Sequence, residues 1–461
     1  MKLKIYFAFT FFMLFVLEIS AQQTYVPDDN FENYLENNGM GNGVPGDNYV
    51  LTDNIVSVVS LEVYAQNIAD LTGIEDFAAL QNLQCQNNQI TTLDLTNNSY
   101  LVQLNCASNQ LTSLDISNLQ NLENVDCSYN QLNNLNMVGS SAITNLRCGS
   151  NSLTNLNLNS IAALQLFDCS FNSLTSLDLT DNGSLATFYC KENQLGHLDL
   201  SHNAGLQHVD CSKNQLTYIT IAENNTLTYL DCSENNLATL NLESNTALQE
   251  LYCYFNQLTD LNLTGDAALT YVACHVNNLT TVDLSGNVAL EKFYSRDNQL
   301  VTLDFTNNAN LIEMNCFNNQ LTGLNIRNGN NANMTYFDAT DNPNLVCIFV
   351  DDKNWSTAHW TLIDAKSNFV ETQAECDALG IEDEQEIPFK VYPNPVTDVI
   401  YIQSKNPGNY ILIDLTGKII REASFAKGTN KVTVSQIPEG LYFLRIFSDQ
   451  NNRTVKLVVN K

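Results

Sequence analysis

Cysteine recurs every 21 residues through the middle of the chain, from Cys85 to Cys274 without a slip. Ser295 occupies the next place in the series, and Cys316 occupies the place after it. Each of these twelve positions is followed three residues later by Asn, and that Asn is followed two residues later by Leu or Ile. A fixed period of this length identifies an internal repeat, so the chain is expected to fold as a stack of similar coils.

The alternation around each cysteine predicts a short strand. Leu83 and Cys85 fall on one face of that strand, whereas Asn82, Gln84 and Gln86 fall on the other. A single coil cannot bury its apolar side chains, but stacked coils share them. We therefore expect short parallel strands side by side, with the recurring Asn bonded to turn backbone groups that would otherwise be buried without partners.

The spacing and the recurring Asn resemble those of leucine-rich repeat proteins, over residues 54–345. The resemblance implies a curved solenoid of short parallel strands with a 21-residue repeat and capped ends. An end coil would expose its core, so a cap is needed at each end. We assign the N-terminal cap to residues 22–53, where Phe31 and Leu35 fall on one face of an expected helix, and the C-terminal cap to residues 346–380.

The first residues predict export. Two lysines precede an apolar run over residues 5–17, and the small pair Ser20-Ala21 follows, which is typical of a signal peptide over residues 1–21. A short signal anchor is the alternative. No later stretch is long and apolar enough for a membrane span, so we expect no transmembrane segment in the mature protein.

An acidic linker over residues 381–386 separates the solenoid from a different C-terminal segment. Over residues 387–461 we expect a small antiparallel β-sandwich, because short β-rich runs alternate there with Pro, Gly and Asn turns. The runs are residues 399–403, 410–415, 431–434, 441–447 and 454–459.

This C-terminal segment resembles the sorting domain of type IX secretion cargo. The motifs that carry the resemblance are Val391-Tyr392-Pro393-Asn394-Pro395, Asp414 before Gly417-Lys418, Gly440-Leu441-Tyr442, and Lys456-Leu457-Val458-Val459. The resemblance implies that the type IX secretion machinery is a partner, that the domain is removed after translocation, and that the passenger is released or attached to the cell surface. An ordinary C-terminal sandwich is the alternative.

Eleven of the thirteen cysteines occupy the inward position of the repeat, where a small polarizable side chain fills a buried column. Side chains that point the same way into a core rarely meet the geometry of a disulfide. There is no CxxC pair and no His recurs beside the column, so we expect no metal site. Cys347 and Cys376 lie outside the column in the expected cap of an exported chain, and we predict one disulfide between them.

Motifs for catalysis are lacking. The sequence contains no GxSxG, HExxH or GxxxxGK[ST] motif, so we expect neither catalytic residues nor a cofactor. The formal net charge of −30 opposes binding to nucleic acid, whose phosphate backbone is also negative.

Two outward columns suggest other functions. An Asp column would suit calcium, although Asn replaces Asp in several coils, which favours a hydrogen-bonding ladder; it comprises Asp94, Asp115, Asp178, Asp199, Asp283 and Asp304. A Thr column suggests a structural or ice- and solute-interacting surface as the alternative function; it comprises Thr91, Thr112, Thr154, Thr175, Thr217, Thr259, Thr280 and Thr322.

The outward positions of the concave strands change in character along the chain. The early coils carry small amides such as Gln84 and Asn105, and the coils from about residue 188 onward carry aromatic, His and Arg residues. Tyrosine is also common on strand surfaces, but aromatic and Arg residues on a polar face are typical of recognition. The sequence therefore predicts an exported, non-enzymatic binding protein, secreted or on the cell surface, for protein or glycan partners. The candidate binding residues are Tyr189, Tyr229, Tyr252, Tyr254, Tyr271, His275, Tyr294, Arg296 and Phe317.

Overall fold

The structure is a computed structural model of the 461-residue chain. It describes residues 22–221, 223–379, 389–415, 417–448 and 451–460. The expected signal peptide and acidic linker lie outside these residues. Contacts divide the chain after Glu371 into two compact units, each described by itself.

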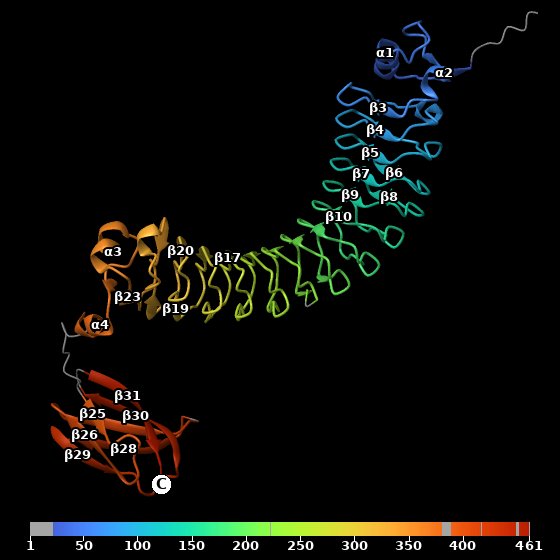
Figure 1. Cartoon of the computed structure of the whole chain (residues 1–461). Coiled ribbons are helices and arrows are strands. Elements are labelled where there is room, and N and C mark those ends of the chain that lie inside the picture. The colour runs from blue at the N-terminus through green and yellow to red at the C-terminus, as the bar shows by residue number, and fades with distance from the viewer. Residues whose placement is uncertain (1–21, 222, 380–388, 416, 449–450, 461) are drawn as a thin grey trace, which may run out of the picture. The chain divides into compact units, whose positions relative to one another are not determined.

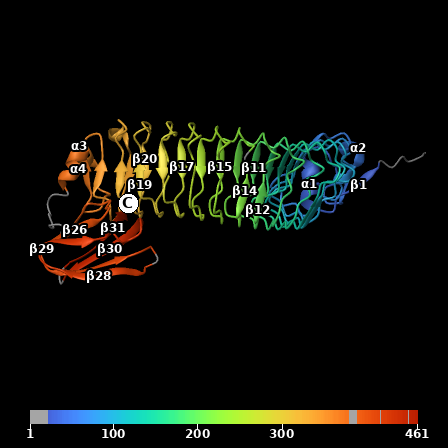
Figure 2. The same cartoon turned by 90° about the horizontal axis from the view of Figure 1, so that it is seen from below.

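The coils of the first unit build one long parallel sheet of fourteen strands, each three residues long. Figure 1 shows this sheet on the inner side of the arc that the coils follow, and Figure 2 shows its strands in a row. The expected curved solenoid of short parallel strands is thus confirmed. The strands are β3 (Ser60–Glu62), β4 (Asn82–Gln84), β5 (Gln103–Asn105), β7 (Asn124–Asp126), β9 (Asn145–Arg147), β10 (Leu166–Asp168), β11 (Thr187–Tyr189), β13 (His208–Asp210), β15 (Tyr229–Asp231), β16 (Glu250–Tyr252), β17 (Tyr271–Ala273), β18 (Lys292–Tyr294), β20 (Glu313–Asn315) and β22 (Tyr336–Asp338).

Strand pairing follows the repeat. Neighbouring strands pair residues 21 positions apart, as Val209 does with Leu230. The first pair is one residue longer, and two residues are added between β20 and β22, where the 3-10 helix η2 (Asn331–Asn333) is inserted. The central residue of every strand in this sheet is buried, and so is the ladder residue that follows it.

Shorter sheets lie on the outer side of the arc, where pairing is interrupted rather than continuous (Figure 1). The outer strands are β6 (Ser113–Asp115), β8 (Asn134–Asn136), β12 (His197–Asp199), β14 (Tyr218–Thr220), β19 (Thr302–Asp304) and β21 (Gly323–Asn325), and the sheet of β19 and β21 continues into β23 (Cys347–Phe349) and β24 (Asn368–Val370). Between the two sides, the stacked Leu, Ile, Phe and Cys side chains form a continuous core.

The recurring Asn ties each coil to the one before it. The Nδ2 of Asn193 donates to the carbonyl oxygens of Cys169 and Cys190, at 3.0 and 3.1 Å, and its Oδ1 accepts from the backbone N–H of Leu174 at 2.9 Å. The side chain is only 8% exposed. The expected role of this Asn is therefore confirmed: it supplies partners to backbone groups that are shut off from water.

A second buried Asn column was not identified from the sequence, although it has the same period. The Nδ2 of Asn203 donates to the carbonyl oxygens of Leu179 and Asn182, at 3.1 and 2.9 Å. The column comprises Asn98, Asn182, Asn203, Asn224, Asn245, Asn287 and Asn308. Asp266 takes the place of Asn in one coil of this column, and it is 2% exposed.

The chain N-terminal to the coils folds over the first of them. The side chain of Asp28 accepts from the first backbone N–H groups of α1 (Asp29–Asn37), and this helix buries Phe31 and Leu35. The other elements of this region are β1 (Gln23–Tyr25), β2 (Tyr49–Leu51) and α2 (Thr52–Ile55), and the 3-10 helix η1 (Ile74–Asp76) follows β3 in the first coil.

Aromatic residues cover the last coils. Trp360 stacks on Phe337 with ring centroids 4.3 Å apart and also contacts Phe369. The elements after the last inner strand are β23 (Cys347–Phe349), α3 (Lys353–His359), β24 (Asn368–Val370) and α4 (Gln373–Leu379).

The cysteine predictions are confirmed. Cys347 and Cys376 are disulfide-bonded, and the eleven ladder cysteines are free and buried.

The second unit contains two antiparallel sheets, as expected from the alternating C-terminal runs. One has the order β25-β26-β29, and the other has the order β28-β27-β30-β31. Their bounds are β25 (Phe389–Tyr392), β26 (Val399–Ser404), β27 (Gly408–Ile413), β28 (Ile419–Phe425), β29 (Gly428–Thr433), β30 (Gly440–Ser448) and β31 (Asn451–Val459). The two sheets share a core of buried residues that includes Ile400, Leu412 and Leu444. Within the described ranges of the whole chain, no helix has the length and apolar character needed to span a membrane.

Candidate binding surface

The inner sheet presents three columns of outward side chains. They stand three residues before the ladder cysteine, one before it and one after it, which at Cys253 gives Glu250, Tyr252 and Tyr254. We refer to them as the first, second and third columns. Because paired strands are in register, the side chains of one column lie side by side in successive coils, about 4.8 Å apart.

All nine predicted binding residues lie in these columns and are partly buried. The first column holds Tyr229 and Tyr271, the second holds Tyr189, Tyr252 and Tyr294, and the third holds Tyr254, His275, Arg296 and Phe317.

Six rings from the first two columns form a continuous aromatic file, from Tyr189 through His208, Tyr229, Tyr252 and Tyr271 to Tyr294. The ring centroids of successive members are 5.1, 3.9, 5.4, 4.7 and 5.5 Å apart. His208 was not among the predicted binding residues, yet its ring lies flat against that of Tyr229, with an interplanar angle of 3°. The file crosses from column to column, which sequence spacing alone does not predict.

A small residue allows one of these crossings. Ala273 stands between Tyr252 and Tyr294 in the second column and is 2% exposed. The ring of Tyr271, from the first column, contacts both of those tyrosine rings. The small side chain of Ala273 thus leaves room for the Tyr271 ring to contact the tyrosine rings on both sides of it.

The third column contains a second aromatic group. The rings of Tyr254 and His275 stack with centroids 4.5 Å apart, and the exposed Phe255 meets both edge-on. Arg296 is the next residue along and forms an ion pair with Asp297 at 2.6 Å. Phe317 continues the column, but among the described residues no ring contact to it is found.

Burial governs the ionisation of these rings. It lowers the pKa of His208, although Asp210 and Glu250 oppose the shift, and burial together with Arg296 lowers the pKa of His275 to about 4. Burial also raises the pKa of the Tyr252 and Tyr294 hydroxyls, helped by hydrogen bonds to Glu250 and Glu313 respectively. At neutral pH the surface therefore presents uncharged imidazole rings and phenol hydroxyls.

The early coils present a different surface on the same sheet. Their outward residues are mainly amides and acids, and Asn145 donates to Asn124 across two strands at 2.5 Å. A shallow pocket of about 160 Å³ lies here, lined in part by Gln84, Asp126 and Arg147.

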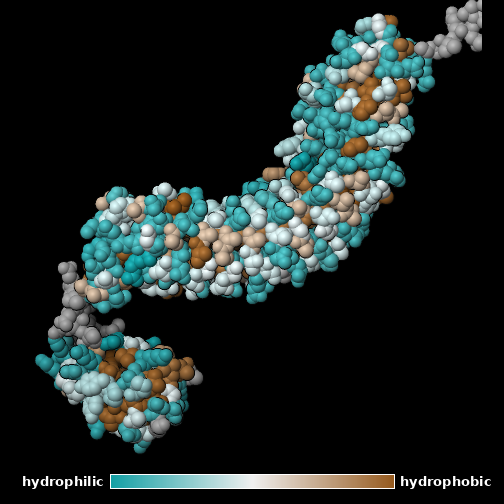
Figure 3. All heavy atoms as spheres, in the orientation of Figure 1, coloured by the Kyte–Doolittle hydropathy of each residue, from teal (hydrophilic) through white to brown (hydrophobic). Residues whose placement is uncertain are grey.

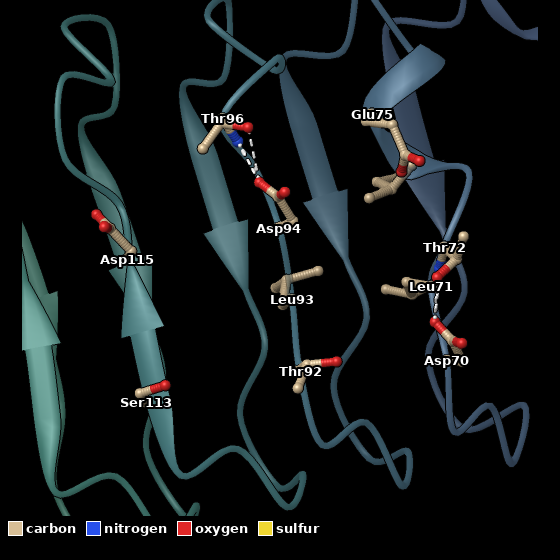
Figure 4. Close-up of a pocket in the computed structure, with 11 residues that line it drawn as sticks. Asp70, Leu71, Thr72, Glu75, Thr92, Leu93, Asp94, Thr96, Ser113 and Asp115 are labelled. Carbon is tan, nitrogen blue, oxygen red and sulfur yellow. Dashed lines mark hydrogen bonds between the residues drawn. The ribbon is translucent and has the colours of Figure 1, made fainter.

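The outer side carries the Asp column. A pocket of about 370 Å³ lies there, lined in part by Asp94 and Asp115. Figure 4 shows the side chains that line it. The Oδ1 of Asp94 accepts from the backbone N–H of Thr96 at 3.0 Å, and this bond lowers the pKa of Asp94. Asn136 and Asn262 accept in the same way in their own coils, so the column acts as a ladder of turn-closing oxygens. Within the described part of the chain, no three His, Cys, Asp or Glu side chains come together as metal ligands.

The Thr column is exposed at all eight of its positions. It is interrupted at the equivalent places by Asn133, Gly196, Ala238 and Val301. The visible face of the solenoid in Figure 3 is mainly hydrophilic, with apolar residues in small separate spots. An interrupted column on a curved stack is a poor template for a flat crystal surface.

The first unit is thus a leucine-rich repeat solenoid with an aromatic file on its concave sheet. Residues 390–460 match the family model of the secretion system C-terminal sorting domain, so the second unit contains such a domain.

Proteins of known structure share the solenoid fold. The chain is similar to internalin J of Listeria monocytogenes, with 34% identity over 73 residues, which is 16% of this chain and 8% of that protein. The solved functional domain of internalin J, which includes a cysteine ladder, is 24% identical and covers 95% of this chain and 99% of its own, with a TM-score of 0.51.

Two further solved structures show the same fold. An internalin, InlF, from the same species is 19% identical, with 77% of this chain and 99% of that chain covered and a TM-score of 0.54. The leucine-rich repeat ectodomain of the Arabidopsis receptor kinase HAESA, solved with a peptide hormone ligand, is 18% identical, with 64% and 57% covered and a TM-score of 0.51.

Proposed function

We propose that the protein is a non-enzymatic, exported binding protein that takes a protein partner on the concave surface of strands β13 to β18. The observation that carries this proposal is the aromatic file, which replaces small amides only in the later coils. Tyr and Arg are enriched among the residues that dominate binding energy at protein interfaces, and the rigid Tyr ring buries much area at low entropic cost. Adhesion to a host or neighbouring cell is the role that such a surface protein would serve.

The packing of the rings favours a protein partner over a glycan. Sugars bind aromatic residues by stacking on a free ring face. Here the faces of His208 and Tyr229 cover each other, as do those of Tyr254 and His275. A ring face that another ring covers is not available to a sugar, whereas ring edges and hydroxyl groups suit the mixed polar and apolar contacts of a protein interface.

The match of residues 390–460 to the sorting domain supports the proposal that the protein is secreted or attached to the cell surface. We propose that a signal peptide over residues 1–21 directs passage of the inner membrane and that residues 387–461 engage the type IX machinery at the outer membrane. Deletion of residues 387–461 should leave the passenger in the periplasm with its signal peptide removed. Normal surface display of the truncated chain would refute the sorting role.

The binding face is tested with a triple variant. The protein is probed against protein and glycan arrays, and any ligand found is measured against Tyr252→Ala/Tyr271→Ala/Tyr294→Ala. We expect a loss of about 1 to 3 kcal/mol of binding free energy per ring. The matched control is Gln84→Ala/Asn105→Ala/Asp126→Ala on the early coils. Equal losses from both triples, or no loss from the tyrosines, would move the site elsewhere.

A further inference from the structure

We infer that the concave surface binds its partner through a Lys or Arg side chain, which docks on the carboxylate pair Asp210 and Asp231. This inference rests on the proposed function, because it names the chemistry of the partner that the later coils accept. Asp210 and Asp231 are directly paired in the second column, on strands β13 and β15.

Both carboxylates are held in a fixed orientation. The Oδ1 of Asp210 accepts from the backbone N–H and the hydroxyl of Ser212, at 3.0 and 2.6 Å. The Oδ1 of Asp231 accepts from the same two groups of Ser233, at the same distances. Among the described residues, nothing donates to the Oδ2 of either residue within hydrogen-bond distance. Each carboxylate therefore keeps one oxygen for an incoming donor.

The local structure does not need these negative charges. In the same column, Asn105 accepts from the backbone N–H of Ala107 and Asn315 accepts from that of Phe317. A neutral amide therefore makes the same bond to the residue two positions on. The charge of Asp210 and Asp231 is surplus to folding.

The two neighbouring carboxylates also lower the stability of the folded chain. Asp231 is 8% exposed, and this burial, with the charge of Asp210 beside it, raises the pKa of Asp231. Three ion pairs occur among the described residues, and none includes Asp210 or Asp231. Bringing a cation to the pair would remove the repulsion between two poorly solvated charges.

An earlier part of the same column shows how the sequence resolves such a conflict. Arg147 stands directly between Asp126 and Asp168 in paired strands, so positive and negative charges alternate there. The neighbours of Asp210 and Asp231 in this column are Tyr189 and Tyr252, so no basic residue flanks the pair there. Lys191, in the third column, partly offsets the raised pKa of Asp231, but among the described residues it forms no ion pair with either carboxylate. A cation from another molecule would complete this part of the column.

The surroundings select an amphipathic cation. Tyr189 and Tyr252 flank the pair in the second column, and His208 and Tyr229 stand two residues before Asp210 and Asp231 on the same strands. Such rings pack against the apolar stem of a Lys or Arg while its head reaches the carboxylates. Two carboxylates with one free oxygen each are too few for calcium, which takes about six to eight oxygen ligands.

The test compares two pairs of acids in the full protein. Binding of fluorescent octa-lysine is measured at about 150 mM salt, where weak surface attraction is screened. Asp210→Asn/Asp231→Asn is compared with Asp178→Asn/Asp199→Asn, which removes the same charge from adjacent coils on the outer side. Asp178 and Asp199 are both exposed. Each accepts a hydrogen bond from the backbone N–H of the residue two positions later, and Asp178 also accepts from the hydroxyl of Thr180. Asn157 makes the same backbone bond in this column, so Asn is tolerated there. Folding of each variant is checked by circular dichroism.

We expect the inner pair of substitutions to weaken octa-lysine binding about tenfold or more, and the outer pair by less than about twofold. Equal weakening by the two pairs, or no weakening by the inner pair, would overturn the inference. The proposed function and this inference can be told apart. If the tyrosine triple variant loses binding of a ligand but Asp210→Asn/Asp231→Asn retains it, the binding face is supported and the carboxylate pair is refuted. If the protein binds chitohexaose saturably and only the tyrosine triple variant loses this binding, the partner is a glycan and the inferred Lys or Arg contact is refuted.

Discussion

The early and later coils of the inner sheet share a backbone but not a surface. In both halves the ladder cysteine is buried and the following Asn makes the same bonds across two coils, as at Asn109 and Asn256. The outward columns change from amides to rings, as between Gln103 and Tyr271. Inward positions are therefore constrained by the stack, whereas outward positions are free to carry recognition.

The largest loss of stability should come from removing the buried Asn that follows the ladder cysteine in both halves. Asn109→Ala and Asn256→Ala each remove a buried side chain that bonds to three carbonyl oxygens and one backbone N–H. We expect each to lower the free energy of unfolding by about 2 to 5 kcal/mol. Urea unfolding followed by circular dichroism measures this loss. A loss in one half only would show that the halves do not share one stability mechanism.

In the second Asn column, Asp266 replaces Asn in one of the later coils. Burial raises its pKa from 3.8 to about 6, so the folded state loses stability as the pH rises from about 4 to 6. Asp266→Asn removes this loss and adds an amide donor. We expect it to raise the free energy of unfolding by about 2 to 3 kcal/mol above pH 6 and much less at pH 4.

Urea unfolding at pH 4 and pH 7 checks this prediction. The control is Asp283→Asn, at an exposed outer residue that accepts from Ser285, where Asn also serves in other coils. A gain from Asp266→Asn that does not change with pH would contradict the assignment of a buried carboxylate.

The aromatic file should contribute a smaller amount to stability. Tyr271→Ala removes ring contacts to both Tyr252 and Tyr294, and we expect it to cost about 1 to 2 kcal/mol of unfolding free energy. Gln103→Ala, at the exposed equivalent position of the early coils, should change stability by less than about 0.5 kcal/mol. Equal losses would mean that the rings do not pack on one another in solution.

The smallest expected effect is in the ladder thiols, which should not react in either half. Burial raises the pKa of Cys85 and of Cys274 to about 12, and the other ladder cysteines shift in the same direction. Alkylation of the native protein at pH 8 should therefore leave its mass unchanged. After denaturation without reduction, mass spectrometry should find eleven labelled thiols and one disulfide between Cys347 and Cys376. Bridges between successive ladder cysteines would refute the buried column.

Much of the fold could be predicted from one coil. The period of the cysteines and the alternation around Leu83 determine which side chains face inward, because a stack can repeat only if every coil buries the same positions. The second Asn column had the same period and could have been found by the same method. In the second unit, β28 was missed because Ile419 to Phe425 shows no alternation, with six of its seven residues at the surface or partly so. Its place in the sheet depends on pairing with β27.

The candidate site was predicted only in part. The sequence determines which residues occupy the outward columns, since their phase follows from that of the buried ones. Only the tertiary structure decides that the ring of Tyr271 contacts those of Tyr252 and Tyr294, that His208 lies flat on Tyr229, and that Asp231 is largely buried. Those features depend on ring packing between coils and on side-chain volume at neighbouring strands, which a periodic pattern along one chain does not encode.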